Sequence, residues 1–169
     1  MTAREVLAVV DRDRYDVVAV GITRDGRWLL QEHGPESAPG ALPVVGESGG
    51  PVSLAASRLL GESSDGSVQV VAEVDGAFPL LHGPWGEDGT IQGLFEMAGL
   101  RYVGSGVLAS AVAMDKAVAK VVFATAGLPQ LPYTVVHAAE WADDPAAVRE
   151  SVASLHYPVF VKPARAGSS

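Results

Sequence analysis

The run of residues 82–89, His-Gly-Pro-Trp-Gly-Glu-Asp-Gly, combines an imidazole, two carboxylates and three glycines. It follows an apolar stretch at residues 77–81 and precedes residues with helical spacing, which predicts a loop between a strand and a helix N-terminus. In such a loop, backbone N–H groups can approach a small anion while charged side chains fix its orientation. The alternative is a glycine-rich turn in which Asp88 only caps the following helix.

Two lysines lie where they could bind a phosphate. Lys116 follows Asp115 at the predicted start of a helix, from which its flexible side chain could reach a phosphate; the alternative is a solvated surface lysine. Lys162 ends an apolar run and is followed by Pro-Ala-Arg-Ala-Gly-Ser-Ser, which places a cation beside backbone amides and hydroxyls suited to a phosphate. The alternative for residues 162–169 is an exposed lysine at a strand edge followed by a flexible linker.

Composition and charge argue against several classes of protein. The chain has no cysteine, which excludes a thiol nucleophile and a disulfide framework, and its net charge of -8 argues against a nucleic-acid partner. The remaining histidines lack the spacing of metal ligands, so no metal site is predicted at His33, His137 and His156. No apolar run approaches the roughly 18 to 20 residues of a membrane helix, and no export signal is visible, which leaves the cytoplasm as the expected compartment.

Predicted strands and helices alternate along the chain and would position these residues. Apolar runs of strand length are found at residues 15–22, 28–30, 68–71, 77–81, 101–103, 133–136 and 158–162. A turn at residues 24–26 makes 28–30 the return strand of a hairpin that begins with 15–22. Helices are predicted at residues 4–10, at 91–98, from 106, at 116–126 and from 144. Their predicted caps are acidic and their predicted stops are glycines, namely Asp88, Asp115, Asp144, Gly99 and Gly127. The alternation predicts an α/β fold with a parallel sheet, in which ligand loops lie beyond the carboxyl ends of the strands.

Five motifs in this order resemble those of D-alanine:D-alanine ligases, which belong to the ATP-grasp superfamily. They are residues 82–93 (HGPWGEDGTIQG), 102–111 (YVGSGVLASA), 114–116 (MDK) with Lys120, 126–129 (AGLP) and 158–169 (PVFVKPARAGSS). The resemblance is weakest at residues 33–68, of which 33–51 are crowded with Gly, Pro, Ser and Glu and are interpreted as a long surface loop. It implies an N-terminal domain with a Rossmann-like parallel sheet at residues 1–113 and the beginning of an ATP-grasp domain at residues 114–169.

The resemblance also implies an activity. Ligases of this family phosphorylate the carboxylate of one D-alanine with ATP and let the amine of a second D-alanine displace the phosphate, which gives the dipeptide for peptidoglycan. His82 and Glu87 would lie at the first D-alanine site. Ser168 would belong to the hydrogen-bonded network at the substrates, so that Ser168 and His82 are the predicted catalytic residues.

The same resemblance assigns the residues that would hold ATP. Lys116 and Lys162 would contact its phosphates, and Gly167 and Ser169 would belong to the loop that closes over them. Two magnesium ions would assist, and the full-length family implies a homodimer. These assignments agree with phosphoryl-transfer chemistry, which depends mainly on positioning and on neutralising phosphate charge.

The resemblance further implies that the family's sequence extends beyond this chain at both ends. Ahead of Met1 it places a strand and a Gly-Gly-x-Ser-type loop with a glutamate, and beyond Ser169 the magnesium-binding Asp, Glu and Asn residues. The chain alone is therefore expected not to catalyse ligation and, with a strand of its sheet missing, to be marginally stable or self-associating. One alternative is a non-catalytic module that binds D-alanine or nucleotide weakly or pairs with an intact ligase. The other is an ATP-grasp carboxylate:amine ligase for a different amino acid.

Overall fold

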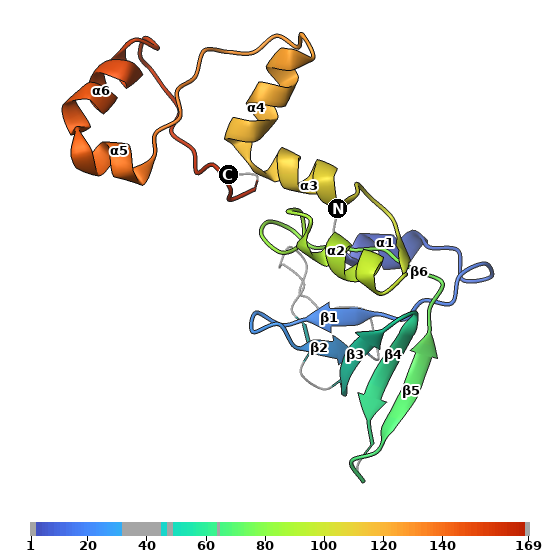
Figure 1. Ribbon diagram of the computed structural model, residues 1–169. Coiled ribbons are helices and arrows are strands. Elements are labelled where there is room, and N and C mark those ends of the chain that lie inside the picture. The colour runs from blue at the N-terminus through green and yellow to red at the C-terminus, as the bar shows by residue number, and fades with distance from the viewer. Residues whose placement is uncertain (1–2, 32–44, 47–48, 64, 168–169) are drawn as a thin grey trace. The chain divides into compact units, whose positions relative to one another are not determined.

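The computed structural model describes residues 3–31, 45–46, 49–63 and 65–167 (Figure 1). The chain divides into two compact units, which are residues 1–80 with 92–104 and residues 81–91 with 105–169. No helix within the described residues is long and apolar enough to span a membrane.

The first unit begins with helix α1 (Ala3–Val9), as the sequence predicts, and continues into a five-stranded antiparallel sheet. Its strands are β1 (Val20–Ile22), β2 (Trp28–Leu30), β3 (Pro51–Ala55), β4 (Arg58–Glu62) and β5 (Val68–Glu73). The sheet order is β1-β2-β3-β4-β5, so each strand pairs with its neighbour in the sequence (Figure 1). Leu29, Val52 and Leu59 on the three central strands are buried, whereas Val70 on the terminal strand β5 is exposed. The apolar core of this sheet therefore lies at its centre.

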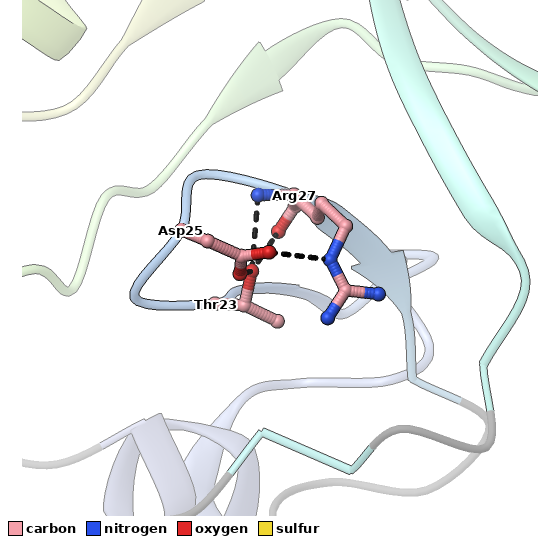
Figure 2. Close-up of polar contacts among 3 residues, drawn as sticks. All are labelled: Thr23, Asp25 and Arg27. Carbon is pink, nitrogen blue, oxygen red and sulfur yellow. Dashed lines mark hydrogen bonds and ion pairs between the residues drawn. The ribbon is translucent and has the colours of Figure 1, made fainter.

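The hairpin between β1 and β2 is closed by a small network of side chains (Figure 2). Arg27 Nε donates to one carboxylate oxygen of Asp25 at 2.8 Å, and the Thr23 hydroxyl donates to the other. These hydrogen bonds hold the pKa of Asp25 below its usual value, with the Thr23 hydroxyl as the larger cause and Arg27 as the next. The return strand predicted at residues 28–30 is confirmed.

A two-stranded sheet and most of the helix between its strands complete the first unit, and the first two residues of that helix belong to the second unit. Its elements are β6 (Gly76–Ala77), α2 (Thr90–Met97) and β7 (Arg101–Tyr102). The two strands pair in parallel, and the Phe95 and Tyr102 rings lie 5.7 Å apart, centroid to centroid. Gly99 ends the helix with φ of 65°, the left-handed conformation common after a helix C-terminus. The parallel pairing on either side of the 82–89 loop and the helix predicted at 91–98 are both confirmed.

The described residues of the second unit form a series of helices. They are α3 (Val107–Met114), α4 (Lys116–Thr125), α5 (Ala138–Asp143) and α6 (Pro145–Ala153). Asp115 caps α4, because its Oδ1 accepts hydrogen bonds from the N–H groups of the second and third helical residues. Asp144 caps α6 in the same way. Both caps and the helices that follow them were predicted from the sequence; the short helix α5 was not.

Two predictions for the second unit are wrong. Residues 133–136 and 158–162 have apolar sequences typical of strands, but neither segment is paired with any described part of the chain. Hydrogen-bonded neighbours and cross-strand packing stabilise a strand, so an apolar composition alone does not produce one. Phe160 and Val161 are consequently 90% and 92% exposed.

The larger sheet also differs from the sequence prediction. The α/β class is confirmed, as are the predicted hairpin of β1 and β2 and the predicted parallel pairing, which holds for β6 and β7. The strands β2 to β5, however, also pair antiparallel. The short connections between β3 and β4 and between β4 and β5 explain the antiparallel pairing of these strands, because parallel strands need a crossover of a dozen or more residues. β1 has three residues rather than the predicted run 15–22. Most of the predicted loop at 33–51 lies outside the described residues, and Pro51 begins β3.

Candidate functional site

The loop of residues 82–89 is folded by contacts within itself. The Glu87 side chain accepts a hydrogen bond from the Gly83 N–H at 2.5 Å, and the Glu87 N–H donates to the Gly83 carbonyl oxygen at 2.9 Å. His82 and Glu87 are both exposed. The loop therefore presents an imidazole and a carboxylate to solvent from one short, internally hydrogen-bonded segment.

Asp88 has a structural role in the same loop. Its carboxylate accepts hydrogen bonds from the Trp85 N–H at 2.9 Å and from the Thr90 N–H at 3.0 Å, which ties the loop to the start of α2. Partial burial raises the pKa of Asp88, but the N–H donors of Trp85 and Thr90 outweigh it and the pKa is lowered. Asp88 was predicted to be the N-cap of this helix, but α2 begins at Thr90, so Asp88 lies one residue ahead of the N-cap position and its carboxylate binds the first helical N–H. The exposed acidic residue of the loop is Glu87.

The start of helix α4 is joined to the loop of residues 163–167. The Lys116 N–H donates to the Ala164 carbonyl oxygen at 3.0 Å, and Lys116 Nζ donates to the Gly167 carbonyl oxygen at 2.7 Å. Figure 1 shows the C-terminal segment returning to the junction of α3 and α4. One lysine therefore holds both ends of this loop, although the two segments are far apart in the sequence.

An ion pair adds a further link between the same two segments. Arg165 Nε lies 2.7 Å from Asp115 Oδ2, with the Asp115 side chain 14% exposed and the Arg165 side chain 79% exposed. The Arg165 guanidinium is the largest cause of a lowered pKa at Asp115, followed by the backbone N–H of Val118. One oxygen of the Asp115 carboxylate therefore caps helix α4, and the other binds Arg165 of the loop.

The 82–89 loop and the 163–167 loop meet at Gly167. A Cβ placed on Gly167 would lie 3.3 Å from Gly83 Cα and 3.5 Å from Glu87 Oε2, and the φ of Gly167 is 68°. Gly89 anchors the first loop in turn, since a Cβ there would lie 2.8 Å from the Val107 carbonyl oxygen at the start of α3. The loop predicted for a small substrate and the loop predicted for a phosphate are therefore neighbours within one unit.

The predicted site residues differ in where the structure places them. Lys116, Gly167 and Glu87 are brought together, with His82 on the same loop as Glu87. Lys162 is exposed in an extended segment, and no described contact joins it to Lys116 or Gly167. The two predicted serines, Ser168 and Ser169, lie outside the described residues.

Arg165 is the residue of this site that the sequence reading missed. From the sequence, Asp115 is predicted to be a helix cap only, and no role is predicted for Arg165. The available signal was the arginine beside the glycine of the predicted phosphate loop, since arginine is well suited to pairing with carboxylate or phosphate. Its carboxylate partner, 50 positions away, could not be identified from spacing alone.

The chemistry of the site suits an anion. Lys116 and Arg165 supply cationic N–H donors beside a loop whose backbone turns at Gly167. Such a set of donors fits phosphate oxygens. Within the residues described, no group of three or more His, Asp or Glu side chains is placed to hold a metal ion.

The sequence matches known ligases along most of its length. Residues 1–105 match the family described as D-ala D-ala ligase N-terminus, and residues 122–169 match that described as D-ala D-ala ligase C-terminus. The D-alanine–D-alanine ligase of Kineococcus radiotolerans is 52% identical over 178 residues, and that of Paenarthrobacter aurescens is 49% identical over 176 residues. Both alignments cover 100% of this chain and 47% of the relative, so the chain spans about half the length of the curated relatives it matches.

Solved structures lead to the same family. The D-alanine–D-alanine ligase from Coxiella burnetii superposes with a TM-score of 0.76 at 28% identity, covering 98% of this chain and 48% of that one. The VanG D-Ala:D-Ser ligase from Enterococcus faecalis gives a TM-score of 0.68 at 31% identity, covering 96% of this chain and 46% of that one. Because the N-terminal family match alone spans more than half of the residues, the chain belongs to the D-alanine–D-alanine ligase family.

Proposed function

We propose that this chain contributes the D-alanine loop and part of the ATP site to a D-alanine:D-alanine ligase, an ATP-grasp enzyme that forms ADP and the dipeptide for peptidoglycan precursors. Family membership supports the ligase chemistry. The observation that carries the proposal is the position of Gly167 against Gly83 and Glu87, because it brings the predicted substrate loop to the predicted phosphate loop.

The first D-alanine is assigned to the 82–89 loop. Its carboxylate and ammonium groups need partners of opposite charge or matching hydrogen-bonding capacity, which Glu87 and His82 offer from one exposed loop. Ser168 is proposed to join His82 in the catalytic set as part of the hydrogen-bonded network at the substrates. The reacting carboxylate must lie close to the phosphate to be transferred, and the contact between the two loops supports that arrangement.

The phosphates of ATP are assigned to Lys116, Lys162, Gly167 and Ser169. Phosphoryl transfer requires neutralisation of negative charge and accurate positioning. The Lys116 ammonium has three N–H donors, one of which holds the Gly167 carbonyl oxygen, so the same group can orient the loop and attract a phosphate. Lys162 directly precedes the 163–167 loop and is exposed, and its assignment to the phosphates rests on the family resemblance.

Magnesium is proposed to take part through ligands supplied from outside these residues. When bound, Mg²⁺ would neutralise negative charge on the phosphates. No cluster of three acidic or histidine side chains among the described residues supports a site within this part of the protein.

The remaining proposals concern the domain boundary, the oligomeric state and the cellular compartment. We assign residues 1–113 to the N-terminal ligase domain and residues 114–169 to the ATP-grasp domain, with the boundary close to Asp115, where α3 ends and α4 begins. The assembled enzyme is proposed to be a cytoplasmic homodimer that acts on D-alanine and ATP, with neither a nucleic-acid nor a membrane partner.

A calorimetric and enzymatic comparison tests the proposal. We expect the 169-residue polypeptide to bind ATP and D-alanine saturably but to release no ADP when D-alanine is added. Substitution Glu87→Gln should weaken D-alanine binding, while Glu73→Gln, on strand β5, should leave it unchanged. Saturable binding of neither ligand would overturn the proposed site, and D-alanine-dependent turnover would overturn the proposed inactivity.

Experiments on the same 169-residue polypeptide distinguish this proposal from two alternative functions. One alternative is a ligase for a different amino acid, and the similarity to a D-Ala:D-Ser ligase makes D-serine the amino acid to test. D-serine should bind the 82–89 loop more weakly than D-alanine if our assignment is correct. The other alternative is a non-catalytic module that binds D-alanine or nucleotide weakly or pairs with an intact ligase. Because binding without turnover is expected of both hypotheses, association with an intact ligase is the property that distinguishes this module. Co-sedimentation with a full-length ligase would reveal that association.

A further inference from the structure

We propose that Asp115 is a positioning residue that holds the 164–167 loop against the start of α4 through its ion pair with Arg165. The proposal rests on the function proposed above, since it gives the loop and Lys116 their role at the phosphates. Asp115 itself does not contact the phosphates. It acts by fixing the 164–167 loop beside Lys116, and the loop and Lys116 are the groups that contact them.

The geometry divides the Asp115 carboxylate between two tasks. Oδ1 accepts from the N–H groups of Ala117 and Val118 at 3.0 and 3.1 Å, which fixes the carboxylate relative to α4. Oδ2 accepts a hydrogen bond of 2.7 Å from Arg165 Nε, which fixes the loop relative to the carboxylate. With its side chain 14% exposed, Asp115 has little freedom to turn, so the helix cap sets the position of the arginine.

The ion pair works together with two hydrogen bonds from Lys116. The backbone N–H of Lys116 holds Ala164, and its ammonium holds Gly167, so that Arg165 is fixed between two anchored residues. These contacts stabilise one loop conformation, the one in which Gly167 lies against Gly83. Loss of the ion pair would leave the ends of the loop attached but let its middle move, so the orientation of Lys116 and Gly167 toward a phosphate would be less well defined.

Asp115→Asn separates the two tasks of the carboxylate. Asparagine is as good a helix N-cap as aspartate but carries no charge for Arg165. Arg165→Ala removes the same ion pair from the other side and leaves the cap intact. Arg165→Lys keeps the charge without the planar guanidinium, and Arg149→Ala, on α6 with its guanidinium 5.1 Å from the Trp141 ring, controls for the general loss of a cation.

We would measure amide hydrogen exchange of residues 164–167 and ATP affinity for these variants in the 169-residue chain. Asp115→Asn and Arg165→Ala should each accelerate exchange and weaken ATP binding by roughly two- to fivefold, as expected for an exposed ion pair, with helicity unchanged. The double variant should be no worse than either single one, Arg165→Lys should recover part of the loss, and Arg149→Ala should resemble the unaltered chain.

Two results would overturn the proposal. One is unchanged exchange at residues 164–167 in both single variants, and the other is independent, multiplying losses in the double variant, which would mean that Arg165 acts without Asp115. Failure of the proposed function has a different signature, because the unaltered chain would then show no saturable ATP binding while the exchange measurement still reports on the ion pair. If Asp115→Asn does not fold, Arg165→Ala and Arg165→Lys carry the test.

Discussion

The Lys116 ammonium donates a 2.7 Å hydrogen bond to the Gly167 carbonyl oxygen, across 51 positions of the sequence. This contact links the first residue of α4 to the glycine that lies against the 82–89 loop. A phosphate-binding lysine in this position would therefore also order the loop that closes over the phosphate. Removal of the Lys116 ammonium should therefore affect both the binding of a phosphate and the order of the loop.

Lys116→Met should abolish saturable ATP binding by the chain. Methionine keeps much of the length of the side chain but removes the charge and every N–H donor. Lys120→Met is the matched control, since the Lys120 ammonium lies 4.5 Å from the centre of the Tyr133 ring rather than on the loop. Calorimetric titration with ATP checks both variants, and equal affinity in Lys116→Met and the unaltered chain would exclude Lys116 from the phosphate site.

Gly167→Ala should destabilise the second unit and weaken D-alanine binding. The φ of 68° disfavours any side chain by about 1 to 2 kcal/mol, and the added Cβ would in addition press on Gly83 Cα at 3.3 Å. Gly127→Ala is the control, because Gly127 has a φ of 72° with nothing within 4 Å of the added Cβ. Urea unfolding should show a loss of free energy in both variants, while only Gly167→Ala should alter D-alanine binding. An identical ligand response in the two variants would mean that the contact between the loops is unimportant.

Stability should fall in acid through Asp88 and Asp115, whose pKa values are lowered in the folded chain. The folded state favours both carboxylates in their charged form, so their stabilisation is complete above the unfolded pKa of about 3.9 and is lost as the pH falls through the lowered folded values. The urea midpoint should be level between about pH 5 and 7 and should drop below about pH 4. Asp88→Asn should make that drop shallower, and an unchanged acid profile would contradict its assigned hydrogen bonds.

Local signals in the sequence predict the helices well. Asp115 and Asp144 are aspartates directly before helical segments, and both cap their helices by the expected side-chain contacts. Gly99 likewise marks the end of α2. These features depend on a few neighbouring residues, so a single sequence contains the information needed to identify them.

Pairing between distant segments could not be predicted in the same way. Residues 158–161 are apolar and include two β-branched valines, yet they form no strand, because pairing depends on a partner that composition does not reveal. The strands β3 and β4 were missed for the converse reason, since Ser, Ala, Arg and Gly interrupt the apolar pattern at residues 51–62. The same limit applies to the site: the motifs identified Lys116 and Gly167 separately, but only the fold shows their contact and the ion pair of Asp115.

Removal of the N-cap of helix α6 should lower the stability of the chain without changing ligand binding. Asp144 accepts hydrogen bonds at 3.0 Å from the N–H groups of Ala146 and Ala147, which have no helical carbonyl to bind at this end. Asp144→Ala should lower the free energy of unfolding by about 1 kcal/mol, whereas Asp144→Asn should stay close to the unaltered chain because asparagine caps equally well. Urea unfolding followed by circular dichroism measures the difference. Because Asp144 shares none of the contacts of the 163–167 loop described above, ATP binding measured on the folded Asp144→Ala chain should be unchanged, and a loss of affinity there would show that α6 supports the phosphate site.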